Sequence, residues 1–266
     1  MAGAVFVLLT VALQAGAAVI TLEDKNSITK FDPASSDGMY SWTIDGVEHL
    51  YQQWFWYRIG DTGGEQPLNS LLLNAVNPVD TNGDGDYDFM TLQYKGQGLQ
   101  VDLKFTLTGG DLGTHTADMA ETITIKNTSA ASISLHFFQY CDMDINGTSD
   151  NDTVEIRDGI RAYQSDPEGG WASETVSISI IGAPSHYEAG LLADILGKLE
   201  DTSPTDLSDE AGPYYGDAAW SFQWDFVLAP GKSVIISKDK LIVPEPATLG
   251  LLALGGLAMV VRKRRK

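Results

Sequence analysis

Apolar and polar residues alternate strictly in three segments of the chain, residues 101–107, 176–180 and 220–228. Successive side chains of a strand point to opposite faces, so this period of two predicts strands with one buried face. Turn signals such as Gly109-Gly110 and Pro230-Gly231 lie between such segments, and no repeated strand–helix unit occurs. The pattern predicts an all-β fold, an antiparallel β-sandwich with two large sheets.

One segment has the helical period instead. In residues 190–200 the apolar side chains recur three and four positions apart, which predicts a short amphipathic helix. Residues 201–215 are rich in Ser, Asp, Pro and Gly and are expected to form a long loop. No internal repeat or composition shift divides the stretch 19–242, which we interpret as one sandwich domain.

The N-terminus has the character of a secretion signal. Residues 4–18 are apolar or uncharged and close on small residues suited to signal peptidase, so residues 1–18 are predicted to be a signal peptide cleaved near Ala17 or Ala18. The usual basic start of such a peptide is missing. The alternative interpretation is a buried N-terminal strand.

The C-terminal segment 243–266 combines three features in a fixed order. Val243 is followed by Pro244, Glu245 and Pro246, then by an uncharged stretch, and the chain ends on five basic residues. This segment resembles the PEP-CTERM sorting signal of bacteria that carry an exosortase. The resemblance implies cleavage near the Pro-Glu-Pro motif by an exosortase-type processing enzyme and transfer to the cell surface or extracellular matrix. The same signal occurs on unrelated proteins, some ice-binding proteins among them, so it indicates where the protein is sorted and does not indicate an activity.

The length and charge of this segment also favour membrane-associated sorting. The uncharged stretch 247–261 has 15 residues, whereas a transmembrane helix needs about 20, so it predicts a marginal, transient anchor in the inner membrane. Five consecutive cations keep the C-terminus in the cytoplasm and place the sandwich outside. The alternative is an ordinary tail anchor that is never processed.

The net charge limits which partners the protein can bind, and the cysteine content rules out an internal disulfide. Without the two terminal segments the chain keeps 17 − 5 = 12 basic and 36 − 1 = 35 acidic side chains, a net charge near −23. Such a charge repels phosphate backbones, which excludes nucleic acid as a partner, and attracts divalent cations. Cys141 is the one cysteine, so no internal disulfide can form, and its apolar neighbours predict a buried side chain.

Two acidic runs have the spacing of calcium loops. In residues 80–88 the candidate ligands are Asp80, Asn82, Asp84 and Asp88. The run resembles the D-x-[DN]-x-[DN]-G-x-x-D loop, in which closely spaced oxygens surround Ca²⁺. In residues 142–150 the corresponding candidates are Asp142, Asp144, Asn146 and Asp150. There the alternative is a hairpin turn after a strand, since Met143 and Ile145 alternate with the acids.

The remaining chemistry gives several hypotheses. Trp54 and Trp56 would stack on sugar rings if exposed, although core packing is the favoured interpretation. No catalytic motif stands out, and no catalytic residue is assigned. The sequence therefore favours a non-enzymatic, exported surface or matrix protein stabilised by Ca²⁺. The alternatives are a carbohydrate-binding module of the exopolysaccharide layer and a secreted glycan hydrolase.

Overall fold

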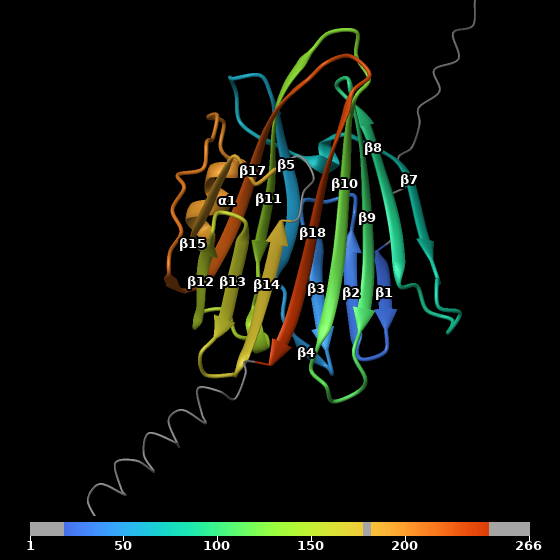
Figure 1. Ribbon diagram of the computed structural model, residues 1–266, viewed down its shortest axis with the longest axis vertical. Coiled ribbons are helices and arrows are strands. Elements are labelled where there is room, and N and C mark those ends of the chain that lie inside the picture. Colours follow the sequence, from blue (N-terminus) through green and yellow to red (C-terminus); the bar gives the residue numbers. More distant parts are fainter. Residues whose placement is uncertain (1–18, 178–181, 245–266) are drawn as a thin grey trace, which may run out of the picture.

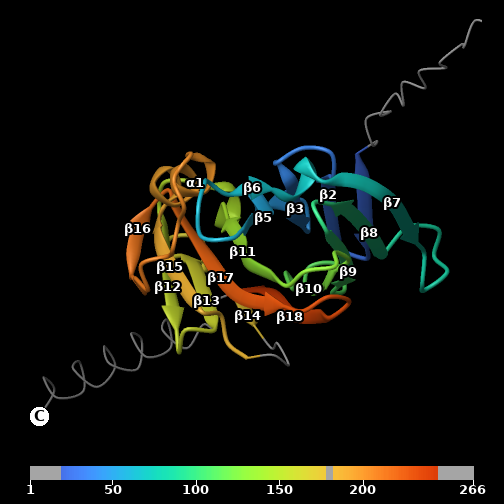
Figure 2. The ribbon, with the colours of Figure 1, turned by 90° about the horizontal axis from the view of Figure 1, so that it is seen from above.

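The computed structural model describes residues 19–177 and 182–244. The predicted signal peptide, the predicted transmembrane helix, Glu245 and Pro246 lie outside the described residues, as do positions 178–180 of the predicted strand 176–180. The described residues form two nine-stranded sheets, which lie as two layers in Figure 2. Figure 1 shows their strands running close to the long axis.

The first sheet follows a seven-strand path with two short additional strands. In spatial order it contains β1 (Ile20–Asp24), β2 (Ser27–Asp32), β3 (Gly38–Ile44), β5 (Gln52–Ile59), β11 (Ile133–Asp142), β17 (Ala218–Leu228) and β15 (His186–Leu191), with β4 (Val47–Glu48) paired to β3 and β6 (Gln66–Pro67) paired to β5.

The second sheet is a single path of nine strands. In spatial order it contains β16 (Tyr214–Gly216), β12 (Asp152–Arg157), β13 (Arg161–Asp166), β14 (Trp171–Ser177), β18 (Ser233–Pro244), β10 (Ala117–Asn127), β9 (Leu99–Gly109), β8 (Phe89–Gly96) and β7 (Leu72–Val79). Strand pairs throughout the described chain are antiparallel, except for a short parallel contact of β3 with β5. The predicted antiparallel sandwich of two large sheets is confirmed.

The strands that face the core on one side show the predicted alternation. In β9 and β10 every second side chain is buried between the sheets, and the others point outward. The predicted helix is also confirmed as α1 (Leu192–Glu200), which packs on β15 and β17 and buries Ile195 and Leu199. Two short 3₁₀ helices, η1 (Leu68–Ser70) and η2 (Ile145–Gly147), complete the described elements.

Strand β5 is buried on both faces. Its inner face packs between the sheets, and its outer face lies under the chain that follows β6 and α1. The Trp54 indole N–H donates to Asn69 at 3.2 Å, and the Arg58 guanidinium donates to the Thr205 carbonyl at 2.8 Å. Trp54 and Trp56 are therefore 0 % and 1 % exposed. The hypothesis that these two indoles stack on sugar rings is wrong, because they are core residues.

A charged cluster lies fully buried between the sheets. Lys238 of β18 donates to the Glu121 carboxylate of β10 at 2.5 Å and also to the Gln139 side chain. Lys240 lies 3.8 Å from Glu121 and 3.4 Å from the Cys141 sulfur. Cys141 is thus buried, as predicted, and burial raises the pKa of its thiol to about 11.

Candidate divalent-cation site

Strand register brings three aspartates together at one end of the first sheet. Asp142 ends β11 and pairs with Ala219 of β17. Two residues beyond Asp142 the chain reaches Asp144, and two residues before Ala219 it passes through Asp217. Because the strands are antiparallel, these two steps run in the same direction in space. One carboxylate oxygen from each of the three aspartates lies within 4.8 Å of the others.

This aspartate cluster runs from the core to the surface. Asp142 is 1 % exposed, Asp144 is half-buried and Asp217 is exposed. A fourth carboxylate, Asp152 at the start of β12, is fully buried and contributes to the electrostatic potential at Asp142. No Lys or Arg of residues 19–177 and 182–244 forms an ion pair with these four carboxylates.

Burial and mutual repulsion perturb the protonation of the cluster. Burial, aided by the charges of Asp144, Asp217 and Asp152, raises the pKa of Asp142 to about 8. Burial likewise raises the pKa of Asp152 to about 8, that of Asp144 to about 6, and that of Asp217. Each raised pKa means that the ionised carboxylate is disfavoured in the folded protein. A bound cation would stabilise the ionised form by offsetting the repulsion between the carboxylates.

Two buried oxygens of the group have no hydrogen-bond donor among residues 19–177 and 182–244. Asp142 Oδ1 and Asp152 Oδ1 are both unpartnered. The second oxygen of Asp142 accepts only a long hydrogen bond of 3.5 Å from the Tyr140 hydroxyl, whereas that of Asp152 accepts from Ile145 N–H and Gln164. A buried carboxylate oxygen without a partner is costly. Oxygen-only donors of this kind suit a hard divalent cation such as Ca²⁺.

The structure changes the ligand set expected for the run 142–150. Asp142 and Asp144 lie in the cluster, whereas Asp150 is not one of its three carboxylates, although its charge adds to the raised pKa of Asp217. The Asn146 side-chain amide donates to Asp166 at 3.2 Å instead, and its backbone N–H donates to His49. Asp217 was missed, because it is 75 residues from Asp142 (217 − 142) and no local spacing connects them.

The run 80–88 forms the exposed connection between β7 and β8. Asp80 accepts from the N–H groups of Gly83 and Gly85, and both oxygens of Asp88 accept from Thr81. These carboxylate oxygens thus accept hydrogen bonds that stabilise the turns of the loop itself. Asn82 donates to Asp24 and Asp84, which connects the loop to β1. A calcium site in this loop stays a prediction.

The last strand leads directly into the sorting segment. Val243 and Pro244 belong to β18 and pair with Ala172 and Trp171 of β14. The sandwich therefore extends two residues beyond the boundary drawn at residue 242. Among the described residues, no helix has the length and apolar character that crossing a membrane requires.

Comparison with known proteins identifies this segment. Residues 243–266 match the model of the PEP-CTERM protein-sorting motif. The C-terminal segment is thus a PEP-CTERM sorting motif, and such a motif implies export and processing by an exosortase. The match covers the sorting segment alone and leaves the role of the sandwich open. None of the curated proteins matches the sequence.

Solved structures resemble the sandwich in fold. A bacterial glucoamylase solved with acarbose aligns with 90 % of this chain at a TM-score of 0.58 and 9 % identity, and the chain spans only 34 % of that protein. The Slr1438 protein from Synechocystis sp. PCC 6803 aligns with 86 % of this chain and 96 % of its own length, at a TM-score of 0.56 and 12 % identity. At these identities the likeness shows the fold alone.

Proposed function

We propose that the protein is a non-enzymatic component of the cell surface or extracellular matrix whose sandwich binds Ca²⁺ and is stabilised by it. The observation that carries the proposal is the buried Asp142 carboxylate, which has an unpartnered oxygen and lies within 4.8 Å of Asp144 and Asp217. A divalent cation would neutralise two of these charges and supply the missing partner.

Location and chemistry both favour calcium. Export places the sandwich outside the cytoplasm, where calcium-binding modules work with dissociation constants of about 10⁻⁴–10⁻³ M. The exposed Asp217 gives the ion a path from solvent to Asp142. The bound ion would connect the end of β11, the start of β17 and the segment leading to η2, so its contribution would be structural.

The burial of Asp142 also favours binding over glycan hydrolysis. A glycoside hydrolase needs one carboxylic acid to protonate the glycosidic oxygen and a second carboxylate beside it. Asp142 has a raised pKa and acidic neighbours, as such an acid does, but at 1 % exposure it cannot touch a sugar. The cluster therefore fits a cation better than a substrate.

Calcium is expected to raise the melting temperature of the full-length protein purified in detergent. At a hundred times the dissociation constant the ion adds about 2.7 kcal/mol, which corresponds to about 5–10 °C for a chain of this size. Asp217→Asn should abolish the gain, and because Asp217 is exposed this variant should still fold. The measurement is a thermal melt in EDTA and in about 10–100 mM CaCl₂, a concentration about a hundred times the expected dissociation constant.

Asp84→Asn is the matched control, since it removes a carboxylate from the loop between β7 and β8. It should keep the calcium-dependent gain. An unchanged melting temperature of the wild type would refute the proposal, and loss of the gain in Asp84→Asn alone would move the site to that loop.

A further inference from the structure

A hollow of about 300 Å³ lies beside the start of β5. It is lined by Asp37 from the connection between β2 and β3, Tyr40 of β3, Tyr51 immediately before β5, and Gln52, the first residue of β5. Tyr51 is 56 % exposed and Tyr40 is half-buried. This volume is at the lower end of the range for small-molecule sites, and it suits one or two ring-sized units of a longer ligand.

The polar groups of this hollow are largely unused. Within the described part of the chain, no residue forms a hydrogen bond with the Asp37 carboxylate or with the hydroxyl of Tyr40 or Tyr51. The Gln52 amide nitrogen donates to the Ser36 carbonyl at 2.7 Å, which fixes the amide and leaves its oxygen as an acceptor. The hollow therefore offers acceptors, hydroxyls and two aromatic rings to a ligand.

We propose that this tyrosine pocket binds a sugar unit of a neutral or amino-sugar polysaccharide. A pyranose has an apolar C–H face that can pack on a tyrosine ring, and its hydroxyls can donate to a carboxylate and an amide oxygen. The Asp37 carboxylate and the formal charge of −19 disfavour uronic acids and phosphorylated sugars and favour a protonated amine. The aromatic residues of the site are thus Tyr40 and Tyr51, instead of the buried Trp54 and Trp56.

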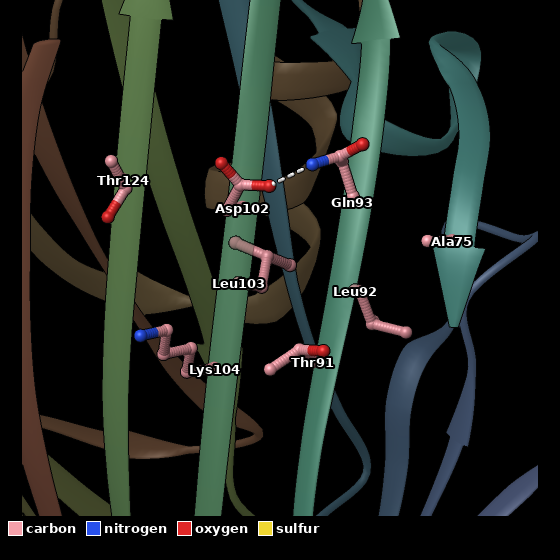
Figure 3. Close-up of a pocket in the computed structure, with 8 residues that line it drawn as sticks. All are labelled: Ala75, Thr91, Leu92, Gln93, Asp102, Leu103, Lys104 and Thr124. Carbon is pink, nitrogen blue, oxygen red and sulfur yellow. Dashed lines mark hydrogen bonds between the residues drawn. The ribbon is translucent and has the colours of Figure 1, made fainter. Parts of the chain in front are cut away.

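A second hollow, of about 350 Å³, shows why the tyrosine pocket is the better candidate. It lies over β7 to β10 and is drawn in Figure 3. Its Gln93 donates to Asp102 at 2.6 Å, as the dashed line in Figure 3 marks, and Gln100 donates to the other oxygen of Asp102. These groups already satisfy one another, and no aromatic ring lines the hollow.

The tyrosine pocket adjoins the aspartate cluster. The Tyr51 N–H donates to the Asp142 carbonyl at 3.1 Å, and Gln52 pairs with Asp142 across β5 and β11. Sugar binding does not require the cation, because no lining residue belongs to the cluster. The two proposals can therefore fail separately.

A glycan array probed with the full-length protein in detergent tests the tyrosine pocket. We expect binding to neutral hexose or amino-sugar oligosaccharides and none to uronic acid oligosaccharides. Tyr51→Ala should weaken the binding at least about tenfold, and Tyr51→Phe should keep most of it because the ring remains. The control is Tyr87→Ala, since Tyr87 is 49 % exposed in the loop between β7 and β8.

The array is run in CaCl₂ and in EDTA, and binding in either condition that depends on Tyr51 supports the pocket. Absence of binding to any neutral or amino-sugar glycan in both conditions would overturn the proposal. So would binding that Tyr51→Ala leaves at the wild-type level. A calcium-dependent melting temperature together with no binding on the glycan array would reject the proposal of sugar binding in the tyrosine pocket. It would not contradict the proposal of a cation site.

Discussion

Glu121→Gln is expected to destabilise the protein by about 3–5 kcal/mol, the usual cost of breaking a buried ion pair by removing one partner. Glu121 is 2 % exposed and accepts from Lys238, with Lys240 at 3.8 Å. Burial raises the pKa of Glu121, but the charges of the two lysines outweigh burial and hold it below its usual range. Without Glu121, two buried ammonium groups would repel each other with no counter-ion.

Burial lowers the pKa of Lys238 to about 8, so the variant could shed part of the charge by deprotonating. Lys240→Met is the matched control, because it removes the surplus cation and leaves the pair of Glu121 and Lys238 intact. It should be neutral or stabilising. Urea unfolding measures both variants, and a Glu121→Gln protein no less stable than Lys240→Met would contradict this description of the buried cluster.

Without a divalent cation, the stability of the protein is expected to fall between about pH 4 and pH 8. Burial raises the pKa values of Asp142 and Asp152 to about 8 in the folded protein, whereas an unfolded aspartate titrates near 3.9. Between these values the unfolded chain has released protons that the folded protein still holds. Each pH unit then favours unfolding by up to about 1.4 kcal/mol per carboxylate. The contribution is fully present below about pH 4 and lost by about pH 8.

Asp142→Asn should reduce this slope and make the protein more stable than the wild type near pH 8 in EDTA. Calcium should flatten the slope of the wild type, since the ion takes the place of the proton. Urea unfolding at several pH values with EDTA or CaCl₂ measures both effects. Asp84→Asn is the control for a carboxylate outside the cluster, and it should follow the wild type. Equal slopes in the wild type and Asp142→Asn would show that Asp142 does not titrate as described.

The fold was predictable wherever a strand has one buried face. The alternation in 101–107 corresponds to β9, which has one buried face, and the helical period corresponds to α1. The alternation in 220–228 corresponds to β17, although the polar residues Ser221 and Gln223 of that strand are buried as well. In β5 the alternation is absent, because the segments that follow β6 and α1 bury its outer face as well. A continuous run of aromatic residues cannot reveal which face is covered, so the exposure of Trp54 and Trp56 required the structure.

The candidate sites were predictable only as far as local spacing reaches. Asp142 and Asp144 are close in sequence, but Asp217 joins them through the pairing of Asp142 with Ala219, which spacing does not encode. In the run 80–88 the spacing suggested ligands, yet Asp80 and Asp88 accept from N–H groups of their own loop. The tyrosine pocket joins residues from two strands and a loop, and no motif marks it.

Isothermal titration calorimetry of the full-length protein with CaCl₂ tests the central claim most directly. The cluster of Asp142, Asp144 and Asp217 predicts one ion per chain, and the binding heat should disappear in Asp217→Asn while persisting in Asp84→Asn. An absence of binding heat in the wild type, or binding that Asp217→Asn leaves unchanged, would contradict the claim that this cluster holds a cation.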